Sequence, residues 1–166
     1  GLGDVYKRQI LSDQKRILLV EDDTSIAALV QHFLSKNQLE VLCAKDAASA
    51  KALFNCQSFD ALLIDVQLPD SSGFELYDAL KASGQTQDLD IPIMYMSGVK
   101  VDIDSISLGY SHGACDYILK PFDLAILLKK LQALLQMSTR IKELEYVVEE
   151  KAALEEELLH LDTDFF

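Results

Sequence analysis

The sequence predicts an α/β fold: a doubly wound, five-stranded parallel sheet with helices on both faces and a long C-terminal helix. Short runs of consecutive apolar residues, such as residues 17–20 and 61–64, have the length and composition of strands buried on both faces. Segments of helical period lie between these runs. Strands that alternate with helices favour parallel pairing through crossover helices.

Each strand is predicted from a short apolar run that polar or turn-forming residues follow. In chain order, the five runs are residues 17–20, 41–44, 61–64, 91–96 and 117–119. In the fourth run, Pro92 is tolerated only because it lies near the start of the strand. Right-handed crossovers leave few ways to arrange such strands, and we expect the flavodoxin-like order 2-1-3-4-5.

The helices are predicted from apolar residues at helical spacing behind a residue that can cap the first turn. The capping candidates are Asp23 or Thr24, Asp46 and Asp123. Another helix is expected from about residue 74 to 82, and a polar loop over residues 83–90 follows it. Residues 102–112 are only a weak helix candidate, because Gly109 and several serines lower the helix propensity.

The chain of 166 residues divides into three parts by pattern. Residues 1–15 have no sustained period, and we expect a disordered leader or a cloning remnant. Residues 16–136 hold the predicted α/β domain. Residues 137–166 are expected to form a helical, coiled-coil-like linker that is cut short before an output domain.

Composition excludes several function classes. No apolar run reaches the roughly 18 residues of a membrane span. A formal net charge of -12 argues against direct nucleic-acid binding, because phosphate backbones are bound by Lys and Arg. Cys43, Cys56 and Cys115 are odd in number and include no C-x-x-C pair or histidine partner at metal-binding spacing, so we expect reduced, mostly buried thiols in a cytoplasmic protein.

Polar residues follow directly after four of the predicted strands. They are Glu21 and Asp22, then Asp65, Ser97 and Lys120. Each alone could be a turn or helix-start residue, but the carboxyl ends of parallel strands meet at one edge of a sheet. Three carboxylates there repel one another, and a hard cation such as Mg²⁺ resolves the repulsion. A lysine and a hydroxyl beside them can hold phosphate oxygens, which makes Asp65 a candidate nucleophile for a phosphoryl group.

In this order and spacing, the motifs resemble the receiver domains of two-component response regulators over about residues 16–135. The quoted motifs are the acidic pair within residues 19–23, Asp65 with Pro69 and Gly73, Ser97-Gly98, and residues 117–122. The resemblance implies a flavodoxin-like phosphoacceptor domain that acts as a switch. It is not expected to be an enzyme, beyond slow loss of its own phosphoryl group.

The resemblance also implies a role for each acidic residue. Asp65 would accept a phosphoryl group from the phosphohistidine of a sensor histidine kinase or a phosphotransfer protein. Asp22 and Asp65 would bind Mg²⁺ or Mn²⁺, with the backbone carbonyl of Gln67 as a further ligand. Glu21 would act on the metal through water.

For the rest of the site, the resemblance implies a phosphate clamp and a switch. Ser97 and Lys120 would hold the phosphoryl oxygens. Tyr117 would turn inward when Ser97 shifts towards the phosphate. The Lys120-Pro121 peptide bond is expected to be cis.

The C-terminal segment has a heptad pattern from Met137 to Leu161. The two seam positions hold Met137, Leu144, Lys151 and Leu158, and Arg140, Val147, Leu154 and Leu161. This pattern favours a short parallel coiled coil and a possible homodimer through the C-terminal helix. The alternative is a solvated amphipathic helix folded back on its own domain.

Two function classes remain open from the sequence. The first is the Mg²⁺-dependent phosphorylatable switch that controls a C-terminal output or dimerisation. The second is a dimerisation or docking module that works without phosphorylation and whose acidic pocket is vestigial. A phosphatase of the haloacid-dehalogenase type is a weaker idea, because it would need an aspartate where Gln67 stands.

Overall fold

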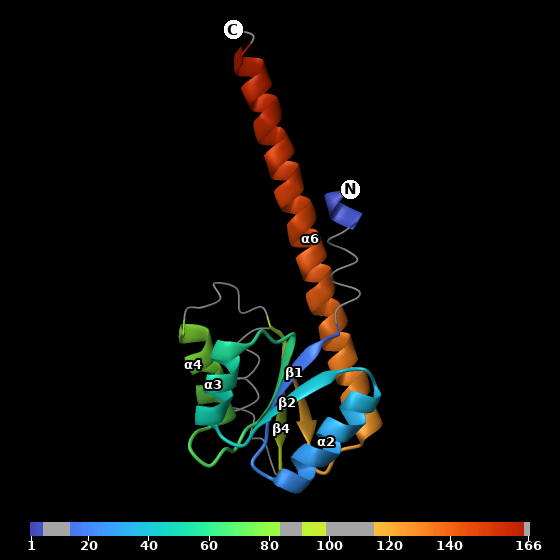
Figure 1. Cartoon of the computed structure of the whole chain (residues 1–166), viewed down its shortest axis with the longest axis vertical. Coiled ribbons are helices and arrows are strands. Elements are labelled where there is room, and N and C mark those ends of the chain that lie inside the picture. The colour runs from blue at the N-terminus through green and yellow to red at the C-terminus, as the bar shows by residue number, and fades with distance from the viewer. Residues whose placement is uncertain (5–13, 84–90, 99–114, 165–166) are drawn as a thin grey trace. The chain divides into compact units, whose positions relative to one another are not determined.

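The computed structural model of the chain describes residues 1–4, 14–83, 91–98 and 115–164 (Figure 1). The chain divides into two compact units, a larger one of residues 13–135 and a smaller one of residues 1–12 and 136–166, and each is described by itself. Most of the predicted leader, the polar loop from residue 84 on and the weak helix at 102–112 lie outside the described residues. The two predicted boundaries between the three parts of the chain stay predictions.

Within the described residues of the larger unit, the strands form one parallel sheet in the order β2-β1-β3-β4-β5. They are β1 (Arg16–Val20), β2 (Glu40–Ala44), β3 (Ala61–Asp65), β4 (Ile93–Ser97) and β5 (Cys115–Leu119). The predicted fold class and strand order are therefore confirmed.

The pairing register brings the carboxyl ends of the strands to one level. The last residue of β1 pairs with Ile64, the residue before Asp65. The last residue of β4, Ser97, pairs with Leu119, the residue before Lys120. The polar residues at these strand ends therefore meet at one edge of the sheet.

Strand boundaries differ from the prediction by one or two residues. β4 begins at Ile93 rather than at residue 91, and β5 begins at Cys115 rather than at residue 117. Pro92 has no N–H for the sheet, but its carbonyl accepts the N–H of Leu62 at 3.0 Å. The strand predicted from the apolar run therefore began two residues too early, at Ile91 instead of Ile93.

Three helices and the first part of a fourth, up to Leu135, pack on this sheet in the described residues: α2 (Thr24–Lys36), α3 (Ala47–Cys56), α4 (Gly73–Ala82) and α6 (Leu124–Asp164). Asp23 rather than Thr24 caps α2, because its carboxylate accepts two N–H groups of the first turn. Asp46 caps α3, and Asp123 accepts from the first turn of α6.

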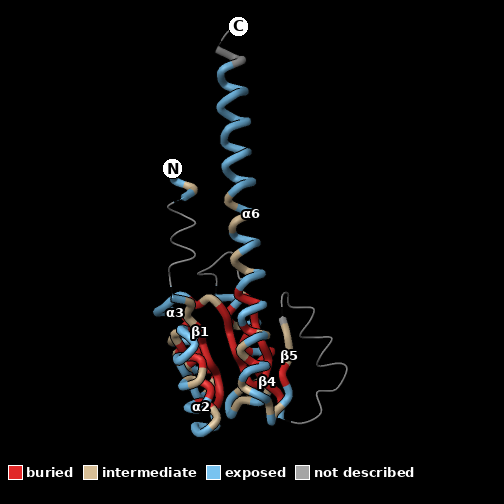
Figure 2. The backbone as a smooth tube through the Cα atoms, turned by 90° about the vertical axis from the view of Figure 1, so that its right-hand side faces the viewer, coloured by how far each residue is buried: buried red, intermediate tan, exposed pale blue. Residues whose placement is uncertain are grey.

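The helices cover both faces of the sheet (Figure 1). α2 and the first turns of α6 pack on one face, and α3 and α4 pack on the other. Because side chains alternate along a strand, Ile17 and Leu19 join the first core, while Leu18 and Val20 join the second. Figure 2 shows the central strands buried throughout, which explains their uninterrupted apolar runs.

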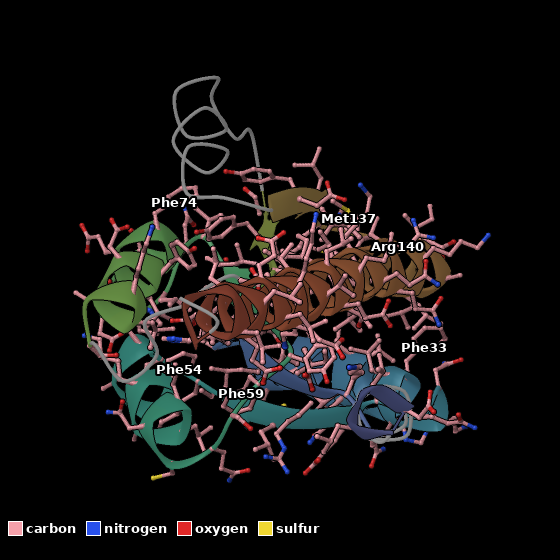
Figure 3. All side chains as sticks on the ribbon, turned by 90° about the horizontal axis from the view of Figure 1, so that it is seen from above. Phe33, Phe54, Phe59, Phe74, Met137 and Arg140 are labelled. Carbon is pink, nitrogen blue, oxygen red and sulfur yellow. The ribbon has the colours of Figure 1, made fainter. Side chains whose placement is uncertain are left out.

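Aromatic side chains fill mainly the α3–α4 face. The rings of Phe54 and Phe59 stack with their centroids 6.3 Å apart. The ring centroids of Phe74 and Tyr95 lie 4.6 Å apart. Figure 3 shows these three phenylalanines beside α3 and α4, whereas Phe33 lies by α2. The second core thus reaches from α3 to the strand that ends in Ser97.

The expectation of mostly buried cysteines is wrong for Cys43 and Cys56, both of which are exposed. Cys43 lies in β2, an edge strand with a neighbouring strand on one side only. Cys56 is the last residue of α3. The predicted strand order already places β2 at the edge, but a short apolar run does not show which of its side chains stay uncovered.

α6 is one helix of 41 residues. In the larger unit, it buries Leu127, Leu131, Leu134 and Leu135. In the smaller unit, the predicted seam begins with Met137 and Arg140 (Figure 3). None of the helices in the described ranges is long and apolar enough to cross a bilayer.

Candidate functional site

The first part of the site lies where β1 ends. Glu21 is only 3% exposed, and its N–H donates to the carbonyl of Ala44 at 3.0 Å. The Glu21 Oε1 atom accepts the N–H of Asp23 at 3.1 Å. Asp23 in turn caps α2, so the chain turns sharply here and leaves Asp22 exposed. One carboxylate is thus buried in the sheet edge and its neighbour faces solvent.

The second part of the site is the end of β3. Asp65 is 6% exposed, and its Oδ1 atom accepts the N–H of Gln67 at 2.9 Å. The following loop closes on itself, since the N–H of Gly73 donates to the carbonyl of Val66 at 2.8 Å. A Cβ atom at Gly73 would lie 2.5 Å from the backbone oxygen of Asp65. Glycine is therefore required here by the close approach of α4 to Asp65.

Lys120 joins the two parts from the end of β5. Its N–H donates to the carbonyl of Ser97 at 2.7 Å, which anchors the residue beside β4. Its Nζ atom donates to Asp65 Oδ2 at 2.8 Å and also to Glu21 Oε2. The Lys120-Pro121 peptide bond is cis. One ammonium group thus bridges two buried carboxylates that belong to different strands.

Burial and the hydrogen-bonded ion pairs both shift the pKa values of Glu21 and Lys120. Burial raises the pKa of the Glu21 carboxyl, and hydrogen bonds from Lys120 and from the Asp23 N–H only partly offset the rise. Burial opposes the charge of Lys120, but its hydrogen bonds with Asp65 and Glu21 outweigh burial and raise the pKa of the ammonium. Lys120 therefore stays charged at neutral pH.

The acidic residues form a group that fits a hard cation. One carboxylate oxygen from each of Glu21, Asp22 and Asp65 lies within 4.8 Å of the others. Hard oxygen donors are the ligands that Mg²⁺ prefers, and Mg²⁺ usually keeps several waters. The exposed side of the group at Asp22 leaves room for such waters. The donor set therefore fits Mg²⁺ or Mn²⁺.

The predicted switch residues lie beside this group. Ser97 is 7% exposed at the end of β4. Tyr117 is half-buried, and its ring centroid lies 5.5 Å from that of the fully buried Tyr95. In this structure, Tyr117 thus packs against the α3–α4 core. Its predicted inward turn stays a prediction.

One contact of this region was not predicted from the sequence. The carboxylate of Asp70, in the loop after β3, accepts the N–H of Ala47 at 2.9 Å and that of Ala48 at 3.1 Å. An aspartate after a proline looks like an ordinary turn residue. The local pattern holds no signal for a partner 23 residues away.

The chain matches known proteins of one family. A family model of the response regulator receiver domain matches residues 17–132, which is more than half of the chain. The chain belongs to the response regulator receiver family. The matched range covers all of the sheet except Arg16, the first residue of β1, and it covers every predicted site residue.

Related receiver domains occur in longer regulators. The regulatory protein VanRB of Enterococcus faecalis is 36% identical over 123 residues, which are 74% of this chain and 53% of VanRB. The DNA-binding dual master transcriptional regulator RpaA of Synechocystis is 33% identical over 126 residues, 76% of this chain and 51% of RpaA. The chain thus spans about half the length of these curated relatives.

Solved receiver structures share the fold. The chemotaxis protein CheY4 of Vibrio cholerae aligns with a TM-score of 0.67 and 30% identity, over 74% of this chain and 99% of CheY4. A CheY-like receiver domain protein from Methanospirillum hungatei aligns with a TM-score of 0.70 and 27% identity, over 77% of this chain and 98% of its own. The receiver domain described here is thus of the CheY-like type.

Proposed function

We propose that this receiver domain is a cytoplasmic phosphorylatable switch, in which Asp65 accepts a phosphoryl group from the phosphohistidine of a sensor histidine kinase or a phosphotransfer protein. The observation that carries the proposal is the bridge of Lys120 between Asp65 and Glu21 beside the exposed Asp22. Receiver domains interact with such kinases and generally bind Mg²⁺ in an acidic pocket.

In the proposed step, a carboxylate oxygen of Asp65 attacks the phosphorus atom of the phosphohistidine. An O–P bond forms and the N–P bond breaks. The electron pair of that bond returns to the imidazole nitrogen of the partner, which takes up a proton. A bound Mg²⁺ supplies positive charge against the phosphoryl oxygens.

The residues of this chain have separate tasks in the step. Asp22 and Asp65 would hold the metal, together with the backbone carbonyl of Gln67, and Glu21 would act through water. The N–H of Gln67 holds Asp65 in place by its bond to Oδ1. Lys120 contacts Oδ2 of Asp65, which supports the proposal that its ammonium would bind the incoming phosphoryl oxygens.

The response would be a shift between two conformations of the domain. A phosphoryl group on Asp65 would draw the hydroxyl of Ser97 towards it, and Tyr117 would turn inward into the space that Ser97 leaves. The phosphoryl group shifts the equilibrium only because it interacts differently with the two states. The domain would thus act as a switch with at most slow loss of its phosphoryl group, and not as an enzyme that turns over a metabolite.

Incubation with acetyl phosphate and Mg²⁺ is expected to add a single phosphoryl group to the chain, and EDTA is expected to prevent the addition. The reason is that clustered carboxylates repel a phosphate dianion unless a cation neutralises them. Intact mass spectrometry measures the adduct, and titration calorimetry of Mg²⁺ measures binding separately. If neither an adduct nor Mg²⁺ binding is found, the switch proposal fails and the docking module with a vestigial pocket takes its place.

The C-terminal part of α6 favours pairing with a second copy as one route for the response. Its described apolar side chains are more than half exposed at Leu144, Val147, Leu154, Leu158 and Leu161, all of them predicted seam positions. Arg140 and Lys151 in the same seam would weaken the pair.

Leu154→Glu is expected to turn a dimer of the whole chain into a monomer, because it places a charge in the middle of the apolar seam. Ala152→Glu is the matched control, since Ala152 is exposed and lies outside the two seam positions. Sedimentation equilibrium reports the mass of all three chains. A wild-type chain that stays monomeric at every concentration would exclude the homodimer.

A further inference from the structure

The first turn of α3 has every one of its free N–H groups satisfied by a side chain. A helix leaves its first N–H groups without partners inside the helix. In α3, the N–H of Asp46 donates to Ser49 Oγ and the N–H of Ser49 donates to Asp46 Oδ1. The N–H groups between them, on Ala47 and Ala48, both donate to the carboxylate of Asp70.

The two carboxylates that bind the first turn of α3, those of Asp46 and Asp70, come from different parts of the chain. Asp46 is the local cap, next to the residues it serves, and the hydroxyl and N–H of Ser49 lower the pKa of its carboxyl. Asp70 comes from the loop of residues 66–72, which carries Gln67 and connects Asp65 to α4. Its carboxylate is therefore a link between two parts of the fold as well as a cap.

The other described hydrogen bonds of residues 66–72 stay within the loop or go to β3, β4 and α4. Within the loop, the N–H of Leu68 donates to the carbonyl of Ser71 at 3.0 Å. The N–H of Val66 donates to β4, and Ser72 caps α4. Among the hydrogen bonds described for residues 66–72, those of Asp70 are the ones that reach α3.

The helix start that Asp70 binds is also joined to the acidic pair. Ala44, two residues before Asp46, accepts the N–H of Glu21 through its carbonyl. A short path of hydrogen bonds and covalent links therefore runs from the Gln67 loop through the first turn of α3 to Glu21. Both ends of this path carry groups that the proposed function assigns to Mg²⁺.

We propose that Asp70 is a positioning residue for the metal site: it ties the loop that carries Gln67 to the start of α3 and so fixes the spacing of the two metal-binding loops. The inference rests on the proposed function, because it concerns the Mg²⁺ site. The described hydrogen bonds of the Asp70 side chain go to Ala47 and Ala48 and not to Asp65. Its effect passes through the backbone of its loop.

Titration calorimetry of Mg²⁺ with the full chain tests the inference. Asp70→Ala is expected to raise the Kd for Mg²⁺ by about threefold to tenfold, at or below the losses seen when residues that orient metal ligands are removed. Asp46→Ala is the matched control, because it also removes one carboxylate that caps α3, and the described hydrogen bonds of this carboxylate go to Ser49 of the same helix. It is expected to change the Kd by less than about twofold, since the cap it removes is local.

Hydrogen exchange in the metal-free protein supplies a second readout. In Asp70→Ala, the amides of residues 66–72 are expected to exchange faster than in the wild type, whereas Asp46→Ala is expected to affect α3 alone. Asp70→Asn keeps one acceptor oxygen and is expected to fall between the wild type and Asp70→Ala in both measurements.

The outcomes separate the two proposals. Equal changes of the Mg²⁺ Kd in Asp70→Ala and Asp46→Ala would overturn the positioning role. The loss of a helix cap or of one negative charge would then be enough to explain the weaker Mg²⁺ binding. An unchanged Kd in Asp70→Ala would overturn it as well. If the wild type binds no Mg²⁺, the proposed function fails, and the exchange of the loop amides still decides whether Asp70 ties the loop to α3.

Discussion

Asp65→Asn is expected to abolish the phosphoryl adduct formed with acetyl phosphate and Mg²⁺ while the fold stays intact. An amide has almost the same shape as a carboxylate and can still accept the N–H of Gln67. It lacks the charged oxygen that must attack phosphorus. Intact mass spectrometry measures the adduct, and circular dichroism checks the fold of the variant.

A charge-matched control belongs to this experiment. Asp78→Asn removes one carboxylate from an exposed position of α4. It is expected to accept a phosphoryl group like the wild type. An adduct of undiminished amount in Asp65→Asn would show that another residue is the acceptor, and the assignment of Asp65 would have to be abandoned.

Lys120→Met is expected to slow phosphorylation by acetyl phosphate by about 10²–10³-fold, the loss typical of removing one group that stabilises developing charge. Methionine keeps much of the length of the side chain but has no cation for Asp65, Glu21 or the phosphoryl oxygens. The rate of adduct formation at saturating Mg²⁺ measures the effect. A rate within a factor of about two of the wild type would exclude a role of the ammonium in the transfer.

The same substitution has an expected effect on stability in the metal-free protein. It leaves two buried carboxylates without their cation, which should lower the free energy of unfolding at neutral pH by roughly 1–3 kcal/mol, below the cost of breaking a fully buried pair. The pKa of Lys120 is raised in the folded protein, so its stabilisation is complete below the ordinary lysine pKa and is lost as pH rises through the higher folded value. Urea unfolding with EDTA should therefore show a difference between wild type and Lys120→Met that shrinks at strongly alkaline pH.

Much of the sheet and of the candidate site could be predicted because both depend on local pattern. Strands buried on both faces have no polar side of their own, so their apolar runs stand out in the sequence. Once the strands are known to be parallel, the polar residues at their carboxyl ends must share an edge. The proximity of Glu21, Asp65 and Lys120 follows from that rule without knowledge of any distance.

Other features depend on contacts that no local pattern contains. The bond from Asp70 to the start of α3 needs the relative placement of a loop and a helix. The need for Gly73 comes from a backbone oxygen eight residues earlier, whose position the loop determines. The exposure of Cys43 depends on how much of the edge strand β2 its neighbours cover, which the apolar run of that strand does not show.

The bridge made by Lys120 also bears on how the protein matures. Lys120 follows Asp65 by 55 residues and Glu21 by 99 residues, and it closes the last strand of the sheet. On the ribosome, a growing chain therefore contains Asp65, the proposed acceptor, well before Lys120 is made. Such a nascent chain, or one whose last strand has come loose, would be a poor substrate for a kinase. Phosphorylation would then be restricted to molecules that have finished folding, and no further mechanism would be needed to exclude unfolded ones.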